Sequence, residues 1–266
     1  MASNKLLVLI TGANQGLGYY AAAQMASKGT YHILLGSRSL KKAQTAIQTM
    51  KSDTSLSSPI DISNISPIEI DMTSDLSIQT AAQKLQETYG DVLDILMLNA
   101  GISRAVGIDS DLHVSSYPPK PGEPSLREQY TQQYDTNVFG NAVAIETFLP
   151  LLRNSTKAGG KRIAFTGSST GSITASTRAN HTKYYRIYRS SKSAVNMVMA
   201  SYAHELESEG FVVGASCPGY CATNLNLHKG LKDPREGAKV IVHVATTASK
   251  EECHGKLVDA DGVVPW

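Results

Sequence analysis

The sequence has few residues that could crosslink the chain or bind a metal. Its 266 residues include three cysteines, Cys217, Cys221 and Cys253, so they cannot all pair. None belongs to a C-x-x-C motif, and no cysteine–histidine cluster has zinc spacing. We therefore expect no metal site, and a reducing, cytoplasmic location. Cys217 and Cys221 could form a redox pair, but the Pro-Gly between them favours a turn after a strand.

Strong charge and long apolar runs are also missing. The formal net charge is +2, too small to indicate nucleic acid or an anionic membrane as a partner. No apolar stretch reaches the ~18 residues that span a bilayer. The opening MASNKLLVLITG ends its short apolar run in a glycine loop and not in a cleavage site. We expect a soluble protein that binds neither nucleic acid nor a membrane.

What the sequence does contain is an alternation of short apolar runs and longer amphipathic segments, with no composition break and no internal repeat. The alternation predicts an α/β fold, a Rossmann-type doubly wound parallel sheet of about seven strands with helices on both faces. We expect one domain over residues 1–266. The expected strands are Leu6–Ile10, Ile33–Leu35, Ile68–Ile70, Val92–Leu98, Arg162–Thr166, Phe211–Cys217 and Lys256–Val258.

The expected helices and loops are placed by residues that cap helices and by residues that interrupt regular structure. Ser39 is expected to cap one helix, and Asp233 another that begins at Pro234. The expected helices are Gly16–Ala26, Ser39–Met50, Asp75–Tyr89, Leu126–Arg153, Lys183–Glu207 and the one from Pro234; the expected loops are Lys51–Ser66 and Val114–Pro124.

A glycine-rich loop follows the first expected strand and opens the first helix. It reads T-G-A-N-Q-G-L-G and includes Gly12, Asn14, Gln15, Gly16, Leu17 and Gly18. Dinucleotide folds need such a loop at this place, because glycines let the backbone approach a pyrophosphate and the helix N-terminus offers unpaired N–H groups. The spacing is not G-x-G-x-x-G, so an ordinary tight strand–helix turn is the alternative.

Two residues after the next strands bear on the choice of cofactor. The second strand ends near Ser37 and Arg38, where NAD-binding sites usually carry an acidic residue. An arginine fork suits a 2′-phosphate, so we expect NADP(H); a solvated surface arginine is the alternative. Asp71, after the third strand, is interpreted either as a partner of the adenine amine or as a helix cap or turn residue.

A tyrosine and a lysine share one face of a later helix. Tyr188 and Lys192 are four residues apart. A nearby ammonium lowers the pKa of a phenol, which could then exchange a proton with a carbonyl or an alcohol near neutral pH. Ser168 follows the fifth strand and could hold the same oxygen. Tyr-x-x-x-Lys is common by chance, so its weight comes from the motifs around it.

These motifs resemble those of the short-chain dehydrogenases/reductases over essentially the whole chain, and most closely NADPH-dependent carbonyl reductases and polyketide ketoreductases. The resemblance rests on six motifs in the family's order. They are T-G-A-N-Q-G-L-G, L-N-A-G at Leu98–Gly101, D-T-N-V-F-G with Asn137, G-S-S-T-G around Ser168, Y-R-S-S-K, and C-P-G-Y-C-A-T.

The resemblance implies a role for each matching residue. Tyr188 would be the general acid/base, Lys192 would lower its pKa and hold the nicotinamide ribose, and Ser168 would orient the substrate oxygen. Asn137 would position a water that links Lys192 to solvent. The cofactor would be lined by the glycine loop, Arg38, Asp71, Met72, Asn99, Ala100, Gly101, Tyr188, Lys192, Pro218, Gly219 and Thr223.

The chain departs from the family pattern at one position and in two segments. Leu98 replaces the first asparagine of Asn-Asn-Ala-Gly, which leaves the backbone role intact. Extra residues lie between Gly101 and Asn137 and between Gly171 and Tyr188. The second insertion is basic, with tyrosines interleaved, and is interpreted as a lid over an aromatic or acidic substrate or as a solvated loop. A homodimer, a homotetramer and a monomer all stay open.

The expected function is NADPH-dependent reduction of a ketone or aldehyde, a bulky apolar or aromatic carbonyl compound, to an alcohol. The alternative keeps the fold but not the redox chemistry: a non-redox tailoring enzyme, or an NADP(H)-binding sensor or scaffold. The presence of Tyr188, Lys192, Ser168 and Asn137 together favours the reductase, since fold alone does not decide function.

Overall fold

The computed structural model describes residues 5–56, 60–108, 118–178 and 184–266. Its centre is an eight-stranded sheet in the order β3-β2-β1-β4-β5-β6-β7-β8. Neighbouring strands are parallel except β7 and β8, which form an antiparallel pair. The strands are β1 (Leu6–Ile10), β2 (Tyr31–Ser37), β3 (Ile65–Glu69), β4 (Ile95–Leu98), β5 (Arg162–Thr166), β6 (Val212–Ser216), β7 (Leu257–Asp259) and β8 (Gly262–Val264).

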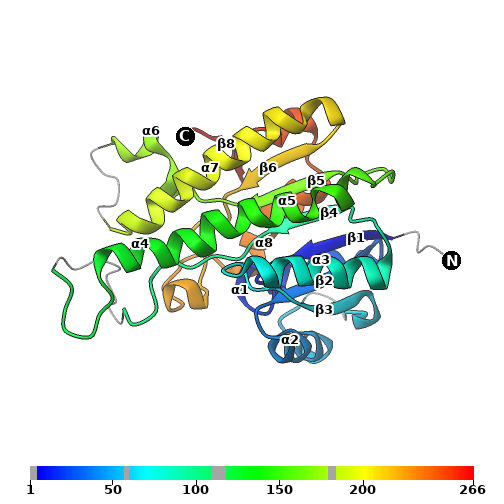
Figure 1. The fold of residues 1–266 in the computed structure, drawn as a ribbon, viewed down its shortest axis with the longest axis horizontal. Coiled ribbons are helices and arrows are strands. Elements are labelled where there is room, and N and C mark those ends of the chain that lie inside the picture. Colours follow the sequence, from blue (N-terminus) through cyan, green and yellow to red (C-terminus); the bar gives the residue numbers. More distant parts are fainter. Residues whose placement is uncertain (1–4, 57–59, 109–117, 179–183) are drawn as a thin grey trace.

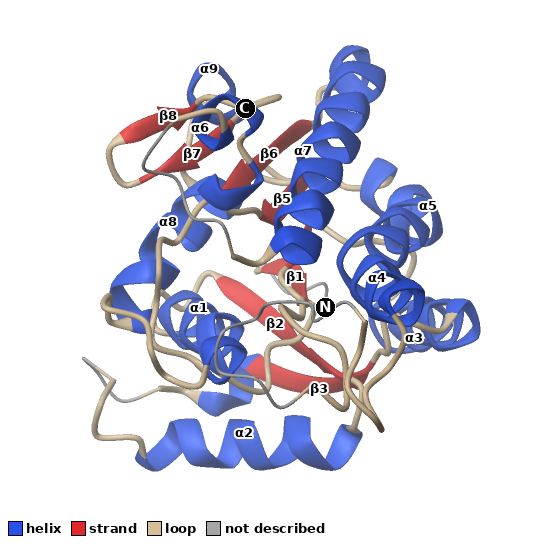
Figure 2. Ribbon diagram, turned by 90° about the vertical axis from the view of Figure 1, so that its left-hand side faces the viewer, coloured by secondary structure: helices blue, strands red, loops and turns tan. Residues whose placement is uncertain are grey.

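Helices cover both faces of this sheet, as the sequence predicts (Figures 1 and 2). α3, α5 and α7 pack on one face, and α1, α2 and α8 on the other. The helices are α1 (Gly16–Ala26), α2 (Leu40–Ser52), α3 (Asp75–Tyr89), α4 (Leu126–Tyr134), α5 (Gly140–Arg153), α6 (Ile173–Ser176), α7 (Arg186–Leu206), α8 (Pro234–Thr246) and α9 (Lys250–Cys253).

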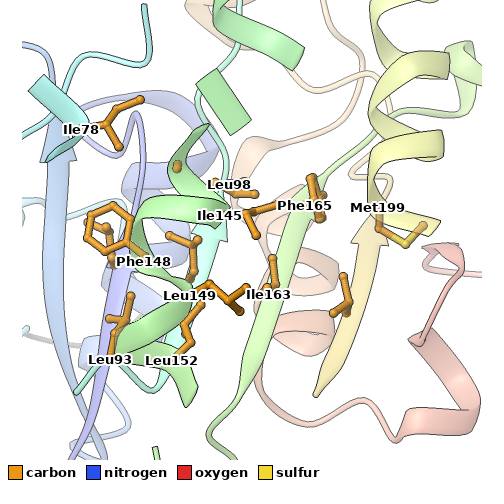
Figure 3. Close-up of a cluster of buried hydrophobic side chains, with 14 of the residues drawn as sticks. Ile78, Leu93, Leu98, Ile145, Phe148, Leu149, Leu152, Ile163, Phe165 and Met199 are labelled. Carbon is orange, nitrogen blue, oxygen red and sulfur yellow. The ribbon is translucent and has the colours of Figure 1, made fainter. Parts of the chain in front are cut away.

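The core between the sheet and the α3–α5–α7 layer is closely packed (Figure 3). Phe148 of α5 is fully buried and shares a cluster with Ile145, Leu149 and Phe165. Ile145, Phe148 and Leu149 fall on one side of α5 because apolar residues recur there three and four positions apart, and Phe165 meets them from β5. Replacing a buried phenylalanine by alanine removes about 3–5 kcal/mol of stability, so this cluster fixes α5 and α7 against the sheet.

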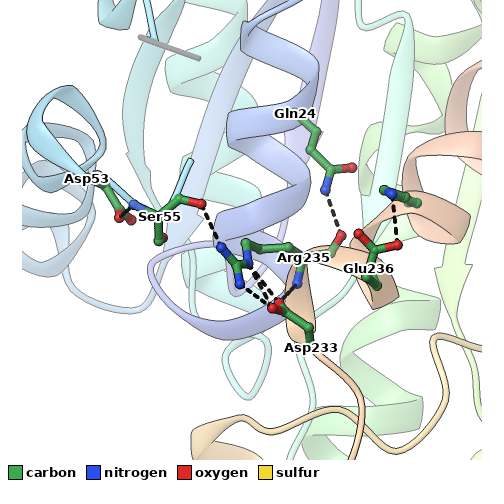
Figure 4. Close-up of polar contacts among 7 residues, drawn as sticks. Gln24, Asp53, Ser55, Asp233, Arg235 and Glu236 are labelled. Atoms are coloured by element: carbon green, nitrogen blue, oxygen red, sulfur yellow. Dashed lines mark hydrogen bonds and ion pairs between the residues drawn. The ribbon is translucent and has the colours of Figure 1, made fainter. Parts of the chain in front are cut away.

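Polar contacts hold the start of α8 against α1 and the segment after α2, in the other helix layer (Figure 4). Asp233 caps α8 by accepting from the Arg235 backbone N–H at 2.8 Å, and it also pairs with the Arg235 guanidinium. That guanidinium donates to the Ser55 carbonyl at 2.9 Å, and Gln24 of α1 donates to the Arg235 carbonyl at 2.8 Å. The Asp233 cap and the start at Pro234 are both as predicted.

Several predicted boundaries are wrong on the β3 side of the sheet. β3 begins at Ile65, and a 3-10 turn, Ile62–Asn64, precedes it, so the predicted loop Lys51–Ser66 is too long; residues 57–59 lie outside the described part. The strand predicted at Ile68–Ile70 missed the first residues of β3, because Pro67 argues against a strand in the sequence. Proline lacks an N–H, yet it is tolerated here because β3 is an edge strand.

Other differences come from packing that a sequence pattern does not record. β4 begins at Ile95 and not at Val92, because the Leu93 N–H donates to the Leu151 carbonyl of α5. β8 is an additional short strand, and Val263 in it is 59% exposed. An exposed three-residue strand carries no burial pattern that would predict it.

The predicted helices Leu126–Arg153 and Lys183–Glu207 also need correction. The first is divided into α4 and α5 by a π-helical turn at Asp135–Phe139. In the second, α7 starts at Arg186, and Lys183 lies outside the described part. Of the predicted loop Val114–Pro124, residues 118–124 are irregular, and the rest lies outside the described part.

The strand order places a topological switch point between β1 and β4. After β1 the chain continues to β2 on one side of the sheet, and after β4 it continues to β5 on the other side. Open α/β sheets bind ligands outside the carboxyl ends of the strands at this point. The glycine loop follows β1, and Asn99 follows β4. Across the described residues, no helix combines the length and the apolarity that crossing a membrane requires.

Candidate active site

The glycine loop after β1 packs directly on the loop after β4. Gly12 and Gly16 adopt φ of 62° and 59°, values that side chains other than glycine rarely take. A Cβ at Gly12 would lie 2.8 Å from the Ala100 Cα, and one at Gly18 would lie 2.5 Å from the Asn99 Nδ2. Both glycines are therefore required for the close approach of the two loops.

Asn99 ties these loops together with hydrogen bonds. Its Nδ2 donates to the Thr11 carbonyl at 3.0 Å and to the Gly12 carbonyl at 3.3 Å. The Thr11 hydroxyl accepts from the backbone N–H groups of Asn99 and Ala100, both at 3.0 Å. The two loops thus form one rigid edge at the switch point.

The loop after β6 reaches the same edge. A Cβ at Gly16 would lie 3.7 Å from the Cβ and Cγ2 of Thr223. The Asn224 side chain donates to the Gln15 Oε1 at 2.9 Å. No side chain caps the N-terminus of α1 among the described residues, which leaves backbone N–H groups there for an anion.

The remaining residues of the predicted loop are divided between the site and the packing. Asn14 is half-buried. Leu17 is 3.1 Å from where a Cβ at Gly237 would lie, so it packs α1 against α8. Pro218 is buried and Gly219 is exposed with φ of 82°.

Arg38 extends from the end of β2 into solvent. It is exposed, while Ser37 before it is buried. No hydrogen bond or ion pair of the Arg38 side chain is formed within the part of the chain that the structure describes. Asp71 caps a turn, since its Oδ1 accepts from the N–H and the hydroxyl of Thr73 at 3.0 and 2.8 Å. Met72 is buried against Gly140 at the start of α5.

Ser168 and Tyr188 meet across the carboxyl end of β5. Ser168 precedes a 3-10 turn, Ser169–Gly171, and its hydroxyl is hydrogen-bonded to the Tyr188 phenol. Gly171 makes this contact possible, because a Cβ there would lie 2.6 Å from the Lys192 carbonyl carbon. The turn is thereby pressed against α7, and the two hydroxyl groups face one another.

Lys192 is buried one helical turn beyond Tyr188. Its Nζ donates to the Thr166 carbonyl at 2.7 Å and lies 5.6 Å from the centre of the Tyr188 ring. Burial lowers the pKa of Lys192 to about 8. Burial also raises the pKa of Tyr188, as does Cys217, while the hydrogen bond with Ser168 opposes that rise. The expected lowering of the Tyr188 pKa by Lys192 is therefore not seen, because burial raises this pKa.

Asn137 lies in the π-helical turn and is fully buried. Its Oδ1 accepts from the Ile102 N–H at 2.8 Å, and its Nδ2 donates to the Ile102 carbonyl at 2.9 Å and to the Ser191 hydroxyl at 3.0 Å. A Cβ at Gly101 would lie 3.3 Å from the Asn137 Oδ1 and 3.8 Å from the Lys192 Nζ. Asn137 therefore joins the loop after β4 to α7, and Gly101 leaves room between them.

Sequence reasoning missed the residues that hold these groups in place. Thr11, Thr166 and Ser191 each provide an oxygen to a predicted site residue. Cys217 accepts from the Ser169 N–H at 3.1 Å and so supports the turn after Ser168. A hydroxyl or thiol just beyond the end of a strand was the available signal for Thr11 and Cys217. Thr166 acts through its backbone carbonyl, and Ser191 gave no signal.

Groups suited to a metal are missing from this edge. Within the described ranges, no set of three or more histidine, cysteine, aspartate or glutamate side chains could hold a metal ion. The arrangement instead joins a phenol, a hydroxyl, an ammonium and a buried amide beside a glycine loop at a switch point. Such groups can bind a dinucleotide and exchange a proton with an oxygen.

Comparison with known proteins agrees with this geometry. The model of the short chain dehydrogenase family matches residues 6–233. The short-chain dehydrogenase anuI of Penicillium roqueforti is 43% identical over 268 residues, with 99% of this chain and 97% of that protein covered. Carbonyl reductase [NADPH] 1 of Mus musculus is 23% identical over 302 residues, with both chains fully covered.

A solved structure shares the fold. NADPH-bound carbonyl reductase from chicken fatty liver superposes with a TM-score of 0.77, at 24% identity, covering 99% of this chain and 100% of that chain. At this identity the likeness supports the arrangement of the sheet and helices.

Proposed function

Because the chain belongs to the short-chain dehydrogenase family and is an oxidoreductase, we propose that it uses NADPH to reduce a ketone or aldehyde to an alcohol. The proposed substrate is a bulky apolar or aromatic carbonyl compound. The observation that carries the proposal is the hydrogen bond between Ser168 and Tyr188, with Lys192 buried next to them. One NADP(H)-binding domain over residues 1–266 is part of the proposal.

The residues present fit a nicotinamide dinucleotide. Gly12 and Gly16 leave the backbone open in front of α1, whose first N–H groups suit the pyrophosphate. Lys192 would hold the nicotinamide ribose, and Thr223, which lies against the glycine loop, would bond the carboxamide. When bound, the reduced cofactor supplies a hydride to the carbonyl carbon and becomes oxidised.

The preference for NADPH over NADH rests on Arg38. Its guanidinium is exposed at the end of β2, where it would meet a ribose 2′-phosphate with charge-assisted hydrogen bonds. The mouse relative carries NADPH in its name, and the chicken carbonyl reductase was solved with NADPH bound. These names agree with the expected preference.

The chain's own part in the chemistry is proton transfer and charge stabilisation. The hydride brings two electrons to the carbonyl carbon, and the carbonyl oxygen then needs one proton. Tyr188 would give that proton, because its raised pKa keeps the phenol protonated at neutral pH. Ser168 would donate a hydrogen bond to the developing alkoxide, and the Lys192 ammonium would stabilise the phenolate left behind.

NADPH consumption by the full chain tests the proposal. Absorbance is followed with a panel of ketones, aldehydes and quinones, and Tyr188→Phe is the control. We expect turnover that disappears in the variant while NADPH still binds. Turnover that persists in Tyr188→Phe would contradict the assignment, and tight NADPH binding without turnover of any carbonyl compound would favour a non-redox role.

A further inference from the structure

Two tyrosines meet beside the Ser168–Tyr188 pair, and the proposed chemistry does not use them. Tyr185 immediately precedes α7, and Tyr220 follows Gly219 in the loop after β6. Their phenol groups are hydrogen-bonded to one another. Tyr185 and Tyr220 are 35 positions apart, and their contact joins the segment before α7 to the loop after β6.

The backbone of Tyr185 is strained at this point. Its φ and ψ are 63° and 30°, in the left-handed region, which costs a side chain other than glycine about 1–2 kcal/mol. Such a conformation persists where its surroundings fix it, and it is concentrated at functional sites. The Tyr185 carbonyl accepts from the Arg189 N–H at 2.7 Å and so begins the hydrogen bonding of α7.

Both tyrosines stand on well-anchored segments. Arg189 donates from Nη2 to the Ser176 hydroxyl at 2.6 Å, which ties the first turn of α7 to α6. The Tyr220 carbonyl accepts from the Lys232 N–H at 3.0 Å. The two rings are therefore held in place by their backbones, as a preorganised contact surface requires.

The same two segments border the catalytic groups. Tyr185 is three residues before Tyr188, about one helical turn away. Cys217, three residues before Tyr220, accepts from the Ser169 N–H at 3.1 Å. The Tyr185–Tyr220 pair consequently joins the segment that carries the proposed proton donor to the loop whose Cys217 contacts the turn after Ser168. Tyr220 is 49% exposed, so its ring is available to a ligand.

We propose that Tyr185 and Tyr220 are specificity-determining residues that recognise an aromatic carbonyl compound bearing a phenolic hydroxyl. This inference rests on the proposed reductase function. The substrate ring would contact the tyrosine rings in offset or edge-to-face geometry, and its hydroxyl would replace one member of the Tyr185–Tyr220 hydrogen bond. Exchange of one phenol for another conserves the bonding, whereas an unsubstituted ring would leave a tyrosine hydroxyl without its partner.

The protonation state of Tyr185 suits this exchange. Burial and the hydrogen bond to Tyr220 raise the pKa of Tyr185 to about 12. The Tyr185 phenol therefore stays neutral throughout the physiological range and can donate to a ligand oxygen. A neutral, donating phenol favours a neutral or weakly acidic hydroxyl over an apolar substituent.

The test compares two aromatic ligands that differ by one hydroxyl. Naphthol and naphthalene are titrated into the full chain saturated with NADP⁺, and tetralone and a ring-hydroxylated tetralone serve as substrates with NADPH. The variants are Tyr185→Phe, Tyr220→Phe and both together. Tyr202→Phe is the matched control, since its phenol bonds to Glu146 at the far end of α7.

We expect the Kd of naphthol to rise about tenfold in the double variant, the loss of one useful hydrogen bond. The Kd of naphthalene should fall or stay the same, because the variant has no tyrosine hydroxyl that this ring could leave without a partner, and the Kd of NADP⁺ should stay unchanged. KM for the hydroxylated tetralone should rise and kcat should hold. The inference would be overturned if the double variant lost affinity equally for naphthol and naphthalene, or for neither, or if KM rose equally for both tetralones. A naphthol-specific loss in an enzyme that turns over no ketone would uphold the recognition and contradict the reductase instead.

Discussion

Lys192 donates a hydrogen bond of 2.7 Å to the carbonyl oxygen of Thr166 at the end of β5. This contact fixes a buried ammonium next to the strand that carries Ser168. Burial lowers the pKa of this ammonium from 10.5 to about 8, although the nearby Cys217 opposes that fall. The site therefore holds a charge that opposes folding, in agreement with the catalytic role proposed for Lys192.

Removing this charge should stabilise the protein. Because the folded pKa of Lys192 is lowered, the unfolded chain binds more protons between about pH 8 and 10.5, and the penalty applies in full below about pH 8. Lys192→Met should raise the free energy of unfolding by about 2 kcal/mol near pH 7, after the lost hydrogen bond is counted. Urea unfolding measures this gain, which should shrink above about pH 8. A destabilised variant would contradict the account.

Reduction should depend on pH through the same lysine. Tyr188 stays protonated across the neutral range because its pKa is raised. Lys192 loses its proton near pH 8 and with it the ammonium that would stabilise the phenolate. We expect kcat for reduction to be flat below about pH 8 and to fall above it. A kcat profile that instead falls on the acid side would assign the controlling proton to another group.

Arg38 should discriminate between the two nicotinamide cofactors. Arg38→Ala should raise the Kd of NADPH about 10–100-fold, the loss of a charge-assisted contact with the 2′-phosphate, and leave the Kd of NADH nearly unchanged. Isothermal titration calorimetry gives both constants. Lys41→Ala, an exposed neighbour in α2, is the control. Similar losses for both cofactors would mean that Arg38 does not read the 2′-phosphate.

Asn137 should be needed for the fold as well as for the site. Asn137→Ala removes three hydrogen bonds and leaves the half-buried Ile102 N–H without its acceptor. We expect a loss of about 2–4 kcal/mol in the free energy of unfolding. Asn154→Ala, which removes one exposed bond to the Asp91 carbonyl, should lose under about 1 kcal/mol. Equal losses in the two variants would show that the buried network contributes little.

Much of the fold could be predicted from local signals. The bounds of β1, α1, α3 and β5 agree with the prediction because each is an apolar run or amphipathic segment with a clear start. Ser39 caps α2 as predicted. The π-helical turn around Asn137 gave no local signal, since its backbone is set by bonds to Ile102 and Ser191 that are distant in sequence.

The candidate site was predictable as a set of residues, but its geometry was not. The four-residue spacing of Tyr188 and Lys192 indicates one helix face. The contact of Ser168 with Tyr188 depends on Gly171 packing against α7, and the raised Tyr188 pKa depends on burial. Tyr185 and Tyr220 are 35 positions apart in the sequence and meet only in the folded chain. Such contacts arise from tertiary packing, which single-sequence patterns do not encode.

Transfer of deuterium from NADPH labelled on the nicotinamide C4 to the product tests the central claim most directly. The full chain is incubated with the labelled cofactor and a substrate identified from the carbonyl panel, and the alcohol is examined by mass spectrometry. We expect one deuterium on the carbinol carbon with the wild-type chain and no labelled alcohol with Tyr188→Phe. An alcohol that lacks the label, or labelled alcohol from Tyr188→Phe at the wild-type rate, would contradict hydride transfer with Tyr188 as the proton donor.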